Sequence, residues 1–255
     1  MRRIEFPGIA TLRGKYLAGM LTAALSAVLY LVPNRWHILP PSYLPITWLD
    51  DAIPFWAASG LVYSAIYLFL LASFVAIRDL AVVSRFVYAC VFTQLVAAAC
   101  FVVWPTVYPR ELYPIPAGAG HLEMVVIQMT RGLDTPANCL PSLHVSTAVL
   151  CACALYADQK SRWWALVALP LALSTLTFKQ HYVVDVGAGL LLGLLAYFAF
   201  FKWQGFGLRP PAGPGTTRAS RAVTRELRAD TDGARDGSQC CVEKTATAPK
   251  GGRRA

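Results

Sequence analysis

Six long apolar segments constrain the fold of this 255-residue chain more than any other feature. Inside a bilayer the backbone polar groups must be paired within the segment itself, so such segments are expected to be helices. Hydrophobic residues make up 56% of the chain and charged residues only 15%, which departs from the balance of a soluble domain. We therefore predict an all-α fold, a polytopic bundle of six transmembrane helices over Tyr16–Val32, Ile53–Ile77, Val82–Trp104, Cys139–Ala157, Trp163–Phe178 and Tyr182–Trp203.

Basic residues ahead of the first apolar segment leave a second interpretation open, namely a secretory signal. The apolar stretch is long, however, and no clean cleavage site of small residues closes it. We expect a retained first helix, and cleavage would leave the orientation of the other five segments unchanged.

The distribution of lysine and arginine predicts the orientation. With the N-terminus in the cytoplasm, eight of these residues lie on the cytoplasmic side before Lys202 and eleven more follow from Lys202 onward. The outer side then holds only Arg35, Arg110, Arg131 and Lys179. This asymmetry obeys the positive-inside rule, so both termini are predicted to be cytoplasmic.

The composition changes sharply near residue 207, which predicts two parts. Residues 1–206 would form the six-helix membrane domain, with the informative motifs within 105–189. Residues 207–255 are rich in glycine, proline, serine, threonine and charge and show no apolar periodicity, so we expect a disordered, basic cytoplasmic tail. A basic tail beside a bilayer favours contact with anionic lipid, and the lack of interleaved aromatic residues argues against nucleic-acid binding.

The first informative stretch is "NCLPSLHVSTA", residues 138–148, at the outer end of the fourth segment. Pro141 suits the first turn of a helix, which would leave the backbone N–H groups of Ser142, Leu143 and His144 unpaired and pointing outward. Such a helix start binds anions, and phosphate is a common occupant. The Ser142 hydroxyl would add a donor, and His144 would be placed to give a proton to the bound anion.

The second stretch, "STLTFKQHYVVDVGAG" (residues 174–189), joins the fifth and sixth segments on the same outer side. His181 and Asp185 are four residues apart, so on a helix they share one face. The carboxylate can accept the Nδ1 proton of His181 and leave Nε2 free. A histidine and an acid at this spacing also suit a divalent cation. Because no further ligand lies at a plausible spacing nearby, we predict no metal and no other cofactor.

"PSLH" followed about 37 residues later by "HYVVD" resembles the type-2 phosphatidic acid phosphatase superfamily of membrane lipid phosphatases and phosphotransferases. The resemblance covers roughly residues 50–205 and implies a six-helix bundle with its active site on the extracytoplasmic side, here expected in a bacterial inner membrane. It implies that His181 is the nucleophile, oriented by Asp185, and that His144 protonates the leaving group. Ser142 and backbone N–H groups around Leu143 would hold the phosphate.

The chain also departs from the pattern of these phosphatases. Their Lys-x6-Arg-Pro motif corresponds here to "WPTVYPRELYP", which contains Arg110 without the upstream lysine. Where they carry Ser-Arg before the nucleophile, this chain has Ser174 and Thr175. Arg110 and Lys179 are therefore the expected phosphate-binding cations, with Arg131 as a weaker candidate. The leucine of "PSLH" and the missing arginine look like the head-group transferase branch, which includes inositol phosphorylceramide synthases and, more distantly, sphingomyelin synthases.

Several functions stay open on the sequence. The expected partners are a lipid phosphate substrate and membrane lipids; the second acceptor is either water, as in a phosphatase, or an alcohol, as in a transferase. A transporter would place its polar groups near the midplane and show an inverted repeat, and neither is visible here. A non-catalytic relative that binds lipid phosphate would keep its function after His144→Ala, whereas an enzyme would lose turnover.

Overall fold

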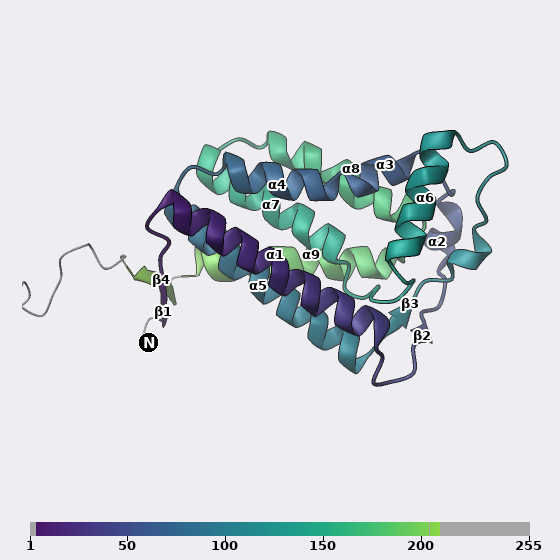
Figure 1. The fold of residues 1–255 in the computed structure, drawn as a ribbon, viewed down its shortest axis with the longest axis horizontal. Helices are drawn as coiled ribbons and strands as arrows, with labels where there is room; N and C mark the ends of the chain where they lie inside the picture. Colours follow the sequence, from purple (N-terminus) through teal and green to yellow (C-terminus); the bar gives the residue numbers. More distant parts are fainter. Residues whose placement is uncertain (1–3, 204, 210–255) are drawn as a thin grey trace, which may run out of the picture. The chain divides into compact units, whose positions relative to one another are not determined.

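The computed structural model describes residues 4–203 and 205–209 and is mostly helical, as predicted (Figure 1). The helices in chain order are α1 (Leu12–Arg35), α2 (Trp48–Ala52), α3 (Ser59–Ser64), α4 (Ile66–Ala76), α5 (Leu80–Val103), α6 (His121–Leu133), α7 (Leu143–Gln159), α8 (Trp163–Thr177) and α9 (Val183–Tyr197). A 3₁₀ turn, η1 (Arg110–Leu112), precedes α6, and a π-helical turn, η2 (Phe198–Lys202), extends α9. Each of the six apolar segments contains one or two of these helices.

Length and composition separate these helices into two groups. Within the described residues, four helical stretches are long and apolar enough to cross a membrane: Leu12–Arg35, Ser59–Ala76, Leu80–Val103 and Val183–Lys202. The helix Trp163–Thr177 is apolar but shorter, and α7 has 17 residues. The structure thus gives a helical bundle with four segments of full spanning length, where the sequence predicted six spans.

Helix α7 lies at the centre of the bundle and packs against α4, α5, α8 and α9 (Figure 1). Its sequence suits that position, because small residues such as Ala148, Cys151 and Ala154 let neighbouring helices approach, and all three are fully buried. Helix α1 packs mainly along α5, and most of its side chains are exposed. Helix α7 is therefore enclosed by other helices, whereas α1 lies at the edge of the bundle.

Two glycines set the contact between α7 and α9. A Cβ atom added to Gly193 would lie 2.8 Å from the Ser146 carbonyl oxygen, and one added to Gly189 would overlap the Ser142 carbonyl oxygen. The Ser142 N–H also donates to the Asp185 carbonyl oxygen over 3.1 Å. The helices that carry the two sequence motifs thus touch backbone to backbone at their starts.

Two short parallel strand pairs complete the described structure. β2 (Ser42–Tyr43) pairs with β3 (Thr106–Val107), which joins the first connecting segment to the one before α6. β1 (Ile4–Pro7) pairs with β4 (Phe206–Arg209). Residues 207–209, which the sequence assigned to the tail, therefore belong to a strand. The rest of the predicted disordered tail, 210–255, lies outside the described residues.

Candidate active site

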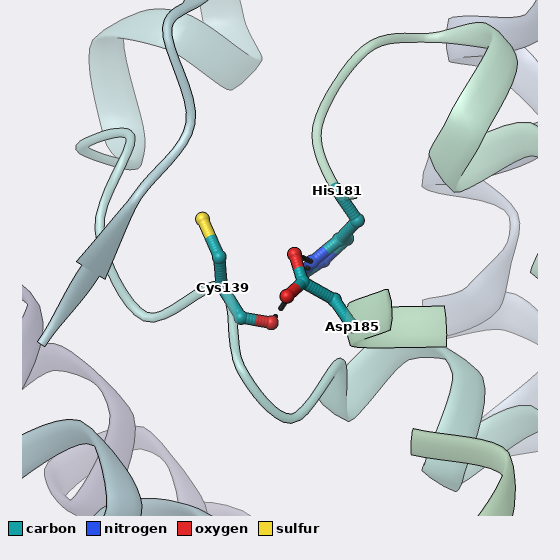
Figure 2. Close-up of side chains that lie close together, drawn as sticks. All are labelled: Cys139, His181 and Asp185. Carbon is teal, nitrogen blue, oxygen red and sulfur yellow. Dashed lines mark hydrogen bonds and ion pairs between the residues drawn. The ribbon is translucent and has the colours of Figure 1, made fainter. Parts of the chain in front are cut away.

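The His181 imidazole is held through its Nδ1 atom by Cys139 and Asp185 (Figure 2). Its Nδ1 atom lies 3.1 Å from the Cys139 carbonyl oxygen and 3.4 Å from Oδ2 of Asp185. Both partners are hydrogen-bond acceptors, so Nδ1 must carry the hydrogen and donate it. In the neutral ring Nε2 is then unprotonated and has a free lone pair. The spacing of His181 and Asp185 predicted this contact, but not on one helix face, because α9 begins at Val183 and His181 lies before its N-cap Tyr182.

The start of α9 fixes Asp185. Oδ2 of this carboxylate accepts the Tyr182 N–H over 2.9 Å, which satisfies one of the unpaired donors at the helix start. The side chain of Asp185 is fully buried, so its orientation is set by these contacts. Just upstream, Lys179 takes a left-handed backbone conformation with φ of 54°, which turns the chain from α8 into α9. His181 lies between that turn and the helix.

The second histidine, His144, lies in the first turn of α7. Its ring stacks on Tyr63 with the centroids 4.0 Å apart, and Tyr67 meets it edge-on at 5.9 Å. The centroids of the His144 and His181 rings are 6.2 Å apart. The buried His144 Nε2 has no hydrogen-bond partner among the described residues. A buried polar atom in that state indicates a place where a ligand atom or water binds.

The start of α7 differs from the prediction in one respect. Ser142 is the N-cap of the helix, so Pro141 lies before the helix instead of within its first turn. The Ser142 hydroxyl oxygen accepts the Val145 N–H over 3.4 Å, as serine commonly does at this position. The Ser142 N–H is already bonded to Asp185, so the prediction that it is an unpaired donor is wrong. The hydroxyl hydrogen of Ser142 and the N–H groups of Leu143 and His144 remain as donors.

Arg110 is buried and paired. Its guanidinium donates to the Asp134 carbonyl oxygen over 2.8 Å and to Oδ2 of the same residue over 3.2 Å. The other carboxylate oxygen of Asp134 accepts the Tyr30 hydroxyl over 2.7 Å. The Nε atom of Arg110 has no partner within the described chain. Asp134 therefore holds this arginine in place and offsets part of its charge.

The loop that carries Arg110 is bonded to the segment before α7. The Tyr108 N–H donates to the Pro136 carbonyl oxygen over 2.8 Å, and the Cys139 N–H donates to the Thr106 carbonyl oxygen over 3.4 Å. Since the Cys139 carbonyl contacts His181, these bonds join the arginine loop to the histidine site.

Two further cations meet at Tyr113. The Lys179 ammonium, which is 3% exposed, lies 4.7 Å from the Tyr113 ring centroid and donates to the Asp50 carbonyl oxygen over 2.7 Å. Arg131 donates to the Tyr113 carbonyl oxygen over 2.7 Å. Burial lowers the pKa of Arg131, and the positive charge on Arg110 lowers it further. The structure thus gathers Arg110, Arg131 and Lys179 around the same loop.

Asp50 is a residue that the sequence analysis missed. It is 3% exposed, and its carboxylate accepts the Val183 N–H at the start of α9 over 2.7 Å and the Thr47 N–H over 2.9 Å. Together with the Lys179 bond, these contacts fix both ends of the turn that carries His181. The spacing of Thr47 and Asp50 is typical of a helix-capping pair, but no local pattern reveals the contact with α9, which is distant in sequence.

We predict that Asp50→Ala lowers the free energy of unfolding by about 3 kcal/mol, because it leaves charged-group hydrogen bonds to Val183 and Thr47 unmade. Asp51→Ala, which removes the same charge from an exposed neighbouring position, is the matched control. Thermal unfolding in detergent measures both variants. Equal unfolding midpoints for the two would contradict a positioning role for Asp50.

Cys139 raises the question of a metal centre. The candidate ligand atoms of Cys139, His181 and Asp185 lie within 4.8 Å of one another. Figure 2 shows the thiol of Cys139 pointing away from the His–Asp pair, while its carbonyl oxygen points toward it. The sulfur contacts the Pro136 carbonyl oxygen at 3.3 Å, and the nitrogen of His181 on this side carries a hydrogen. Because Nδ1 of His181 donates that hydrogen, it has no lone pair to offer a metal in this arrangement.

Comparison with known families agrees with this geometry. A family model described as the PAP2 superfamily matches residues 27–199, which is well over half of the chain and includes both motifs. The chain belongs to the PAP2 superfamily. No curated protein sequence gives a significant match. Members of this superfamily are generally phosphatases or phosphotransferases, and with four apolar helices of spanning length the chain is an integral-membrane, phosphatase-like protein.

Proposed function

We propose that the chain is a metal-independent lipid phosphatase or phosphotransferase that works through a phosphohistidine intermediate on a lipid phosphate or phosphodiester head group. The observation that carries this proposal is the pair of neighbouring imidazoles, one with its Nδ1 hydrogen committed to Cys139 and Asp185, the other with a buried and unpartnered Nε2. The His181 ring is arranged to act as a nucleophile, and the His144 ring is arranged to act as a general acid and base.

In the first step, Nε2 of His181 attacks phosphorus and the bond from phosphorus to the leaving oxygen breaks. Protonated His144 gives its proton to that oxygen, so the lipid product leaves neutral. In the second step, His144 takes a proton from the acceptor, whose oxygen attacks phosphorus and releases His181. Asp185 stabilises the positive charge that develops on the His181 ring.

Cations and backbone donors would hold the equatorial phosphate oxygens in both steps. Arg110 offers its unpartnered Nε, and Lys179 uses only one of its three ammonium hydrogens in the hydrogen bond to Asp50. Arg131 adds a third charge, and the first turn of α7 adds N–H groups of Leu143 and His144. The Ser142 hydroxyl would give the last donor. This set replaces the arginine that stands before the nucleophile in typical phosphatases of the family.

The proposal includes a topology. Six crossings, with α7 and α8 as the short ones, would put both termini in the cytoplasm and the two histidines at the extracytoplasmic face. This follows the distribution of basic residues. A bacterial inner membrane is the proposed location. Lipid substrates would reach the site from the outer leaflet.

A head-group transferase is the second candidate, and one observation favours it. Tyr63, which stacks on His144, belongs to a buried apolar cluster with Ala57, Ile127 and Phe178. Apolar walls beside the proton-transfer group exclude water and strengthen electrostatic interactions inside the site. An alcohol acceptor such as inositol or ceramide, held by contacts that water cannot make, would then compete well against hydrolysis.

The test uses the full chain purified in detergent with EDTA and a panel of lipid phosphates, with and without added alcohols. Phosphate release without an alcohol identifies a phosphatase. Head-group exchange that requires the alcohol identifies a transferase. Activity that disappears with EDTA and returns with a divalent metal contradicts the metal-independent mechanism, and binding without turnover across the panel supports a non-catalytic relative.

The pH dependence of KM tests whether Lys179 binds the substrate phosphate. Burial lowers the pKa of this ammonium from its ordinary value of 10.5, although Asp50 and Asp51 oppose the shift. The charged form is therefore lost earlier as pH rises than in an exposed lysine, and KM for the phosphate substrate should rise early on the alkaline side. Arginine stays protonated, so Lys179→Arg should move this rise to higher pH. Superimposable alkaline limits for wild type and variant would exclude Lys179 from phosphate binding.

A further inference from the structure

A groove lies near the C-terminal end of α7, at the opposite end of the helix from His144. Helices α8 and α9 both pack on α7 but scarcely on each other, which leaves a groove between them. Its volume is about 410 Å³, and Ala152 and Cys153 of α7 lie at its floor. Ala165 of α8 and Tyr197 of α9 form its walls. No residue of this groove takes part in the proposed chemistry.

The groove combines apolar walls with two cations. Arg162 and Lys202 line it, and both are exposed. Lys202 belongs to the π-helical turn η2, a rare geometry that often marks functional positions. Its ammonium lies 5.8 Å from the Tyr197 ring centroid. A ligand that fills this groove must therefore carry an apolar chain and a negatively charged group.

Aromatic side chains place the groove at the depth of lipid head groups. Trp163, beside Arg162, is 70% exposed, and Trp203, beside Lys202, is 47% exposed. Tryptophan and tyrosine gather at both membrane–water interfaces, where their amphipathic rings are most stable. The two cations therefore lie at the level where phosphates of the surrounding leaflet are found.

We infer that this groove is a binding site for one anionic phospholipid of the leaflet opposite the active site. An acyl chain would lie against Ala152, Cys153 and Ala165, and the phosphate would bind between Arg162 and Lys202. In the topology proposed above this is the cytoplasmic leaflet, whose anionic lipids attract such basic positions. The occupied groove would join α8 to α9, the two helices that flank the turn carrying His181.

The experiment exchanges the purified full chain into nanodiscs with equal amounts of phosphatidylglycerol and phosphatidylcholine of identical chains, and counts lipids retained by native mass spectrometry. Wild type should keep one phosphatidylglycerol in preference to phosphatidylcholine. The double variant Arg162→Gln/Lys202→Gln should lose that preference by about tenfold or more. Lys160→Gln removes a charge from the same connecting segment outside the groove and should keep it.

A second variant distinguishes lipid binding in the groove from attraction of anionic lipid by surface charge. Ala165→Phe fills the groove without changing charge, and it should also reduce retention. Equal retention of the two lipids by wild type, an equal loss in Lys160→Gln, or full retention in Ala165→Phe would each overturn the inference. Turnover of a short-chain soluble substrate, measured in parallel, reports on the histidine site alone, so the two proposals succeed or fail separately.

Discussion

Replacing His181 with alanine should lower turnover by about four orders of magnitude or more, as removal of a covalent nucleophile commonly does. The proposed reaction depends on the Nε2 lone pair of this ring, which lies just before α9. The fold should survive, because Asp185 remains bonded to the Tyr182 N–H and Asp50 to the Val183 N–H. Steady-state release of phosphate or exchanged head group measures the loss.

His121→Ala is the control, since this histidine is exposed at the start of α6 and away from both motifs. It should leave turnover within about twofold of wild type, as exposed substitutions away from functional groups usually do. Rapid quenching with a phosphorus-labelled substrate should give an acid-labile, base-stable label on wild type and none on His181→Ala. Label that persists in His181→Ala would assign the nucleophile to another residue.

Gly189→Ala should lower activity by about a hundredfold, through displacement of one motif relative to the other. The added Cβ would overlap the Ser142 carbonyl oxygen, which is backbone and cannot rotate away. Helix α9 must therefore move off α7, and misplacement of catalytic groups by about 1 Å can cost about a hundredfold in rate. Overpacking of this kind also costs about 1–3 kcal/mol of stability.

Gly187→Ala is a closely matched control for this change. It adds the same methyl group two residues earlier in the same helix, where nothing lies within 4 Å of the added atom. Because alanine favours helix over glycine, this variant should be as stable as wild type or slightly more so. Turnover and thermal unfolding are measured for both Gly189→Ala and Gly187→Ala. A fully active Gly189→Ala would mean that the contact between α7 and α9 does not fix the spacing of the two histidines.

Local patterns predicted the parts of this molecule that depend on local physics. The apolar runs identified the helices of the bundle but not α2 and α6, which lie between the predicted segments. The spacing of His181 and Asp185 predicted the contact between them. Pro141 suggested an earlier helix start, but Ser142 is the N-cap of α7, a position that serine favours. Six spans were predicted, and four helical stretches of the described residues reach full spanning length; α7, which is surrounded by other helices, and α8 are shorter.

Local sequence patterns did not predict the contacts between segments that are distant in sequence. The bond from the Val183 N–H of α9 to Asp50 joins residues more than 130 positions apart. Arg110 finds its partner Asp134 on the far side of α6, and no spacing in the sequence marks the two as a pair. Arg110 was predicted to bind phosphate, and the structure adds a partner that the sequence did not reveal, the carboxylate of Asp134. Only the fold determines which carboxylate reaches which cation.

Helix α1 holds the active-site loop although it carries no motif. Tyr30 bonds to Asp134 through its hydroxyl and to Asn138 through its carbonyl, and Asn34 bonds to Thr135. The family match begins at residue 27, inside this helix. A protein shortened to the matched region would keep every motif residue but lose the part of α1 that packs along α5 and supports these bonds. We therefore expect the matched region alone to fold around the two histidines less stably than the full chain.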